Sequence, residues 1–98
     1  MTRIYLGNAF SLQMLDVTVA NTVNIVPVAI GEIAGSDFVS VIGHADTANV
    51  VSNILKRDVP ANRTSVRLEK GDVLYVAQVT GGRLPEGFSL AFLKVTIQ

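Results

Sequence analysis

The apolar residues of this chain occur in short runs that Gly, Asn and Asp interrupt, and this pattern limits what the chain can fold into. Every run is far shorter than the ~18 apolar residues that a membrane-spanning helix needs. Over 98 residues the runs can build one hydrophobic core, so we expect a single domain over residues 1–98. Hydrophobic residues make up 49% of the chain and charged residues only 16%, which indicates that some apolar surface meets a partner chain.

Most of these runs have the composition of β-strands. Because proline cannot donate a backbone hydrogen bond, Pro27 places its strand at a sheet edge or at a bulge. The turn Glu69–Asp72 joins two of the strands into the clearest hairpin of the sequence. The run Phe38–Ile42 fits a helix and a strand equally well. The strands that we expect are Thr2–Leu6, Val23–Ala29, Ser65–Leu68, Val73–Val79 and Leu90–Ile97.

One segment, Asp46–Lys56, has the spacing of an amphipathic helix, with Val50, Val51, Ile54 and Leu55 on one face. Asp46 or Thr47 can cap its start, and Lys56 and Arg57 suit its end. Shorter helical turns are expected at Leu12–Leu15, which Ser11 can cap, and at Gly31–Ser36. The order of elements predicts an α/β fold, a mixed β-sheet of about five strands with flanking helices.

His44 is the only histidine, and it lies where a loop becomes the Asp46–Lys56 helix. Histidine is the side chain that ordinarily changes charge near neutral pH, so His44 is the first candidate for acid or base catalysis. The free amide groups at a helix start also favour a bound anion. A histidine at this position can equally serve as a cap or a packing residue.

Three further groups of residues are candidates for binding. The loop Gly81–Gly87 carries Arg83 and Glu86, and it is either a surface turn with two solvated charges or a lid with a phosphate-binding arginine. Asn62 and Arg63 precede the expected hairpin, and Arg63 becomes relevant if the same cleft holds Arg83. Asn8 and Ser11 follow the first strand, where α/β folds often contact ligands, although turn formation and helix capping also explain them.

The composition argues against several functions. With no Cys and one His the chain cannot build a Cys/His zinc site, and no carboxylate cluster suggests another metal site, so we expect no metal and no cofactor. There is no glycine-rich dinucleotide motif and no P-loop. Eight basic and eight acidic residues balance, which argues against duplex nucleic acid as a partner. The start lacks the layout of a signal peptide, so we expect a cytoplasmic protein without a membrane partner.

Five segments, read together and in order, resemble a known family. They are Tyr5–Leu15, Ile42–Thr47, Asn62–Arg63, Leu68–Val79 and Arg83–Gly87. This set is similar to the viral anti-CRISPR ring nucleases, which degrade cyclic tetra-adenylate, the messenger of type III CRISPR immunity. The resemblance implies a homodimer that cleaves this ring to linear di-adenylates without a metal ion.

The resemblance also implies a set of site residues. The family's catalytic histidine falls on His44, and its glutamate falls on Glu86, which would either orient His44 or hold a ribose hydroxyl. The expected ligand-binding residues are Asn8, Ser11, Asp46, Thr47, Arg63, Gln78 and Arg83. The ribose 2′-hydroxyl would attack the neighbouring phosphorus, so the enzyme would supply alignment, charge stabilisation and a proton from His44.

Asp46 departs from the family pattern, which has a small hydroxyl residue two positions after the histidine. A carboxylate repels phosphate, so we expect Asp46 to cap the helix by accepting backbone amide bonds and the ligand contact at this position to differ.

Two other functions fit the same sequence. One is a non-catalytic sponge that binds a cyclic nucleotide, and the other is a small regulatory protein whose apolar surface docks a partner.

Overall fold

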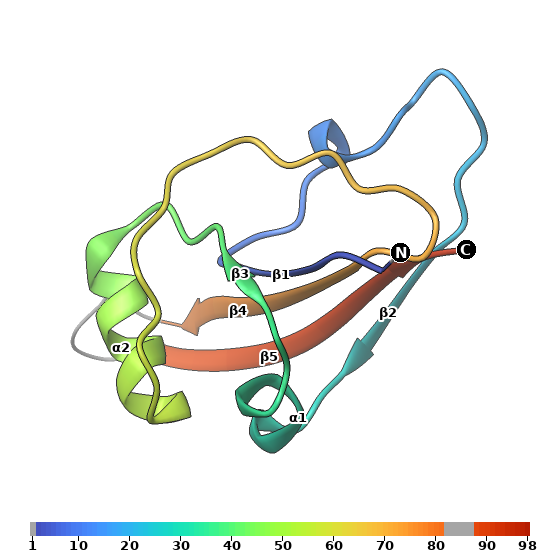
Figure 1. Ribbon diagram of the computed structural model, residues 1–98. Coiled ribbons are helices and arrows are strands. Elements are labelled where there is room, and N and C mark those ends of the chain that lie inside the picture. The colour runs from blue at the N-terminus through green and yellow to red at the C-terminus, as the bar shows by residue number, and fades with distance from the viewer. Residues whose placement is uncertain (1, 82–87) are drawn as a thin grey trace.

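The computed structural model describes residues 2–81 and 88–98, and its described part is built on a five-stranded mixed sheet with the strand order β2-β5-β4-β1-β3 (Figure 1). The strands are β1 (Ile4–Gly7), β2 (Val23–Pro27), β3 (Val39–Ser40), β4 (Val73–Gly81) and β5 (Phe88–Ile97). The helices are α1 (Ile30–Ala34) and α2 (Ala45–Leu55), with a short 3-10 turn η1 at Leu12–Met14. This confirms the predicted α/β fold.

β4 lies at the centre of the sheet and pairs along both of its sides. β1 runs parallel to it, with Ile4 opposite Val73, and β5 runs antiparallel, with Val73 opposite Thr96. On the far side of β1, the short β3 adds a second parallel pair. β2 pairs with β5 at the opposite edge, where Pro27 needs no outer hydrogen bond, so the predicted edge position is confirmed.

The predicted hairpin of Ser65–Leu68 with Val73–Val79 is wrong. Residues 61–69 have no regular secondary structure, because β1 and β5 already occupy both sides of β4. The segment instead crosses one face of the sheet (Figure 1). There Leu68 is buried, Val66 packs beside it, and the Leu68 N–H donates to the Met14 carbonyl over 2.7 Å. The predicted turn before β4 is present, with Gly71 at a φ of +90°, which favours glycine.

Different parts of the chain cover the two faces of the sheet. Alternation along the strands sends Tyr75 and Ala77 to one face and Leu74 and Val76 to the other. Both helices pack on the first face, which we call the helix-side core. Its buried members are Leu6, Ile33, Phe38, Ile42, Ala48, Val51, Leu55, Val59, Tyr75 and Ala77. The other face, which we call the loop-side core, lies under residues from segments 8–22 and 61–69. Its buried members are Leu15, Val41, Leu68, Leu74, Val76, Val95 and Ile97.

Helix α2 spans nearly the predicted residues but buries a different stripe. Thr47, Ala48, Val51 and Leu55 are its buried residues, whereas Val50 and Ile54 are only half-buried. Lys56 ends the helix in the left-handed conformation, with a φ of 56°. The Arg57 guanidinium then donates to the carbonyls of Ala34 and Ser36 over 2.9 and 2.7 Å, and so ties the end of α2 to that of α1.

The Asp72 carboxylate joins β1 to β4 at the end of the pair where both strands begin. It is only 3% exposed and accepts hydrogen bonds from the Arg3 guanidinium at 2.8 Å and from the Glu69 backbone amide at 2.9 Å. Burial raises the pKa of Asp72, but the hydrogen bonds and charge of Arg3 and the backbone amides outweigh it, so the pKa lies below its ordinary value. The stabilisation is therefore present above the unfolded-state pKa and is lost as the pH falls through the lower folded-state pKa.

Asp72→Asn should lower the free energy of unfolding by about 1–3 kcal/mol at pH 7, since it removes a buried ion-pair partner of a half-exposed arginine. The difference from wild type should shrink as the pH falls from about 4 towards 2. Urea titrations at several pH values measure both effects. Asp58→Asn, which removes an exposed carboxylate, is the matched control, and equal losses in the two variants would contradict the assignment.

Candidate functional site

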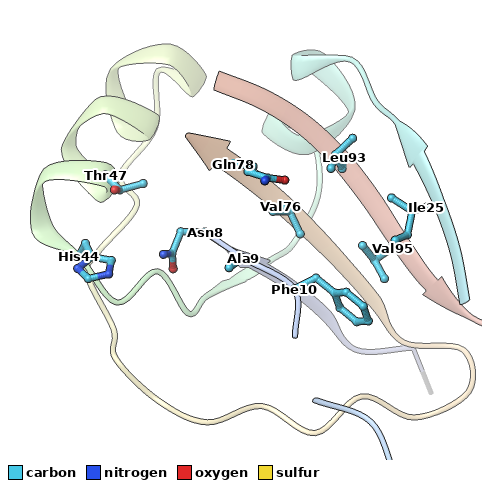
Figure 2. A pocket seen from close by; sticks show the side chains of 10 residues that line it. All are labelled: Asn8, Ala9, Phe10, Ile25, His44, Thr47, Val76, Gln78, Leu93 and Val95. Carbon is cyan, nitrogen blue, oxygen red and sulfur yellow. The ribbon is translucent and has the colours of Figure 1, made fainter. Parts of the chain in front are cut away.

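A cavity of about 510 Å³ opens on the loop side of the sheet, beside the start of α2 (Figure 2). Segments distant in the sequence build it: the residues after β1, the N-terminal turn of α2, and the middle of β2, β4 and β5. Its lining residues are Asn8, Ala9, Phe10, Ile25, His44, Thr47, Val76, Gln78, Leu93 and Val95. The sheet supplies a rigid floor, and the ends of β1 and β3 bring the polar side chains to its rim.

His44 occupies the N-cap position of α2, and its backbone is extended, with φ −125° and ψ 125°. Its carbonyl accepts the Ala48 N–H at 3.0 Å, which starts the helix, while its side chain is exposed towards the cavity in Figure 2. The preceding residues are fixed to β1, because the Val41 N–H donates to the Leu6 carbonyl at 2.8 Å. The imidazole thus stands on a rigid backbone at the positive end of a helix dipole.

Asn8 connects β1 with the loop before His44. Its Oδ1 atom accepts the Gly43 N–H at 3.3 Å, and its side chain also lines the cavity. The sequence left Asn8 open between a ligand contact and a turn-forming residue. The structure gives it a second action, because the same amide positions the backbone next to His44.

Arg63 lines an adjoining cavity of about 410 Å³, together with Asn8, Ser11, Gly43 and His44. The Arg63 side chain passes close to Gly43, where a β-carbon on that glycine would lie 3.4 Å from Arg63 Cγ. Asn8 and His44 line both cavities, so the two spaces meet at these side chains. A phosphate near His44 would therefore lie within the field of the Arg63 guanidinium.

Asn62 fixes the backbone next to this arginine. Its backbone N–H donates to the Ile42 carbonyl at 2.7 Å, and its side-chain Nδ2 donates to the Ser40 carbonyl at 2.8 Å. The Ser40 hydroxyl in turn donates to the Pro60 carbonyl at 2.6 Å. These bonds clamp residues 60–63 against the strand that leads to His44. Sequence reasoning gave Asn62 no such role, because its partners lie about 20 residues away along the chain.

The predicted cap at the start of α2 is wrong for Asp46 and for Thr47. The helix begins at Ala45, and no side-chain hydrogen bond caps it within the described residues. Asp46 instead lies exposed in the first turn, where its negative charge interacts favourably with the positive end of the helix dipole. It lines neither cavity. Ser11 likewise precedes η1 without a side-chain capping bond.

The structure thus gathers most of the predicted site residues that it describes. Asn8, His44, Thr47 and Gln78 share the larger cavity, and Ser11 and Arg63 lie in the adjoining one. Arg83 and Glu86, with their predicted loop, lie outside the described residues. The sequence prediction missed the apolar lining by Phe10, Ile25 and Leu93, although strand alternation at Ile25 was the available signal.

Neither a metal-binding cluster nor a membrane-spanning helix occurs in the described part of the chain. Within residues 2–81 and 88–98, no group of three or more His, Asp or Glu side chains lies close enough to hold a metal ion. No described helix has both the length and the apolar character required to cross a membrane.

On the helix side of the sheet, Glu32 accepts a hydrogen bond from the Tyr75 hydroxyl and forms an ion pair with Lys94. Burial and the hydrogen bond to Glu32 raise the pKa of Tyr75 to about 12.

Comparisons with known proteins identify relatives in viruses. A family model described as STIV B116-like matches residues 4–92. Protein ORF116 of Acidianus filamentous virus 1 is 33% identical over 96 residues, which cover 94% of this chain and 81% of that protein. Protein ORF117 of Acidianus two-tailed virus is 46% identical over 52 residues, which cover 53% of this chain and 44% of that protein.

Among solved structures, B116 of Sulfolobus turreted icosahedral virus has a TM-score of 0.80 to this chain at 22% identity. The alignment covers 96% of this chain and 98% of that one. The two proteins therefore share their fold over nearly their whole length.

Asn62→Ala should release Arg63 from the side of His44 and lower the free energy of unfolding by about 0.5–1.5 kcal/mol, the usual net worth of one hydrogen bond. NMR relaxation at the Arg63 Nε–H should report faster motion. Asn53→Ala is the control, because Asn53 is an exposed amide on α2 without a side-chain hydrogen bond in the described structure. Unchanged Arg63 relaxation in Asn62→Ala would show that the clamp does not hold the arginine.

Proposed function

This chain belongs to the STIV B116-like family of viral proteins, and we propose that it is a ring nuclease that cleaves cyclic tetra-adenylate without a metal ion. One observation carries the proposal. The only histidine shares one cavity with Asn8, Thr47 and Gln78, and Arg63 stands beside it in the adjoining space. These are residues that the ring-nuclease resemblance selects, and the fold gathers them from four separate segments. Cleavage of this messenger would antagonise type III CRISPR immunity.

The proposed reaction is an internal transfer at phosphorus. The ribose 2′-oxygen forms a bond to the adjacent phosphorus, the bond from phosphorus to the 5′-oxygen breaks, and the 2′-hydroxyl proton passes to solvent. Protonated His44 donates its proton to the departing 5′-oxygen, which leaves as a hydroxyl. The products are a 2′,3′-cyclic phosphate end and a free 5′ end. Two such cuts convert the ring into linear di-adenylates.

Charge stabilisation would come from groups around His44. The Arg63 guanidinium offers several donors to the phosphate oxygens, and the amide groups at the start of α2 add positive potential. The Thr47 hydroxyl and the Asn8 amide reach the same cavity and can hold the ribose or phosphate oxygens. Such fixed donors stabilise the charge that develops on phosphate without reorganising during the reaction.

The proposal includes a homodimer. Cyclic tetra-adenylate has approximate two-fold symmetry, and a two-fold dimer would present one His44 to each of two opposite phosphodiesters. Arg83 would add a second cation, and Glu86 would orient His44 or hold a ribose hydroxyl, as the resemblance implies.

A second function, a sponge that binds the ring without cutting it, is favoured by one feature of the site. The His44 side chain is exposed, and no hydrogen bond orients its ring within the described residues. General acids usually have such an orienting partner. The same arginine and amides would bind the ring, which would then be recovered intact.

His44→Ala should slow cleavage of labelled cyclic tetra-adenylate by about 10²–10⁴-fold, the contribution typical of a general acid, while binding is retained. Wild type should keep its activity in excess EDTA. Product analysis by chromatography separates the outcomes. Equal rates in both proteins would remove His44 from the mechanism, and an intact ring with tight binding in both would establish the sponge.

Asp46→Ser should strengthen binding of the same ring about two- to five-fold at low salt, because it removes a carboxylate from the helix start that faces the phosphates. Calorimetry in the His44→Ala background measures this without turnover. The gain should shrink in 0.5 M salt, whereas a change of helix stability would persist there. An unchanged Kd at low salt would place the phosphates beyond the reach of Asp46.

A further inference from the structure

The cavity in Figure 2 has two chemically different ends. His44, Thr47 and Asn8 form the polar end, and Gln78 lies between them and an apolar side. We call this side the apolar wall. It consists of Phe10, Ile25, Val76, Leu93 and Val95.

The apolar wall is a continuous strip across three strands. Ile25 of β2 is opposite Val95 of β5, and Leu93, two residues earlier, is opposite Val76 of β4. Residues two apart on a strand point to the same face, so these side chains lie together on the loop side. Val95 is 1% exposed and forms a floor, whereas Ile25 is 51% exposed at the rim. An isoleucine this open beside a cavity leaves apolar surface for a ligand to cover.

The wall accepts an uncharged, flat group. Among the residues that the structure describes, none of the ten that line the cavity is Asp, Glu, Lys or Arg, so this described lining offers a site for charge at its His44 end. Aromatic rings such as Phe10 stack on nucleobases of any kind. The exposed Gln78 amide offers one donor and one acceptor side by side, the pattern that matches the N7 and N6 atoms of adenine.

From this arrangement we infer that the apolar wall binds one adenine base of the nucleotide whose phosphate lies at His44, and that Gln78 forms hydrogen bonds with the edge of this base. This inference rests on the proposed function. A cavity of about 510 Å³ has room for a base together with its ribose and phosphate. The polar end then fixes the scissile phosphate, and the wall selects the ring by its base.

Ile25→Ser should weaken binding of cyclic tetra-adenylate on the order of ten-fold in the His44→Ala background, because the base loses apolar contact. Ile30→Ser is the matched control, since Ile30 is 42% exposed on α1 and lies outside the cavity. Leu93→Ala, from the centre of the wall, should repeat the loss. Thermal unfolding and sedimentation of each variant show whether it folds and whether its oligomeric state changes.

A second measurement records the methyl signals and the imidazole ring signals of wild type by NMR, with AMP and with ribose 5-phosphate. AMP should shift the Ile25 and Leu93 methyl signals through its ring current, ribose 5-phosphate should not, and both ligands should shift the His44 ring signals. Shifts at His44 alone with AMP would overturn the base site and leave the proposed function standing. No response to either compound and none to the cyclic ring would overturn both. Dissociation of a dimer by Ile25→Ser with an unchanged Kd would make the wall a contact between subunits instead.

Discussion

The central position of β4 is the constraint on which the rest of the structure depends. Its backbone hydrogen bonds are used on one side by parallel β1 and on the other by antiparallel β5. A parallel pair cannot be closed by a tight turn, so the chain must leave β1, travel around the sheet and return to β4. The long path between them carries β2, both helices and the loop over residues 61–69. Every polar side chain of the described site, except Gln78, lies on this path.

The same constraint places the cavity. The helices cover one face of the sheet, and irregular segments cover the other less completely. Where that cover stops, the ends of β1 and β3 meet the start of α2. There the Gly43 N–H donates to Asn8 Oδ1, next to His44. Ligand sites in sheets with parallel strands commonly lie beyond the carboxyl ends of the strands, where the loops diverge. The hydrogen bonds of Asn62 fix the neighbouring backbone, from which Arg63 reaches the adjoining cavity.

Local patterns predicted most elements because each pattern has a local cause. The helical spacing from Asp46 onward located α2, and Pro27 located an edge strand. The errors had a different origin. The strand expected at Ser65–Leu68 has the right alternation, since Val66 and Leu68 do pack inward, but no free strand edge remains beside β4. The cap expected of Asp46 failed because Ala45 is itself a strong helix former and starts the helix one residue earlier, with His44 as the N-cap.

The sequence by itself determined the local features: the β-rich runs, one amphipathic helix, a single histidine at its start, and a set of residues similar to those of ring nucleases. Each of these depends on neighbours within a few positions or on one residue's chemistry. Only the tertiary structure decided that His44, Gln78 and Ile25 share one cavity, and that Asn8 and Asn62 hold the backbone around it. Those relations depend on which strands pair and in which order. Pairing is settled by competition for backbone hydrogen bonds across the whole chain, which no local pattern records.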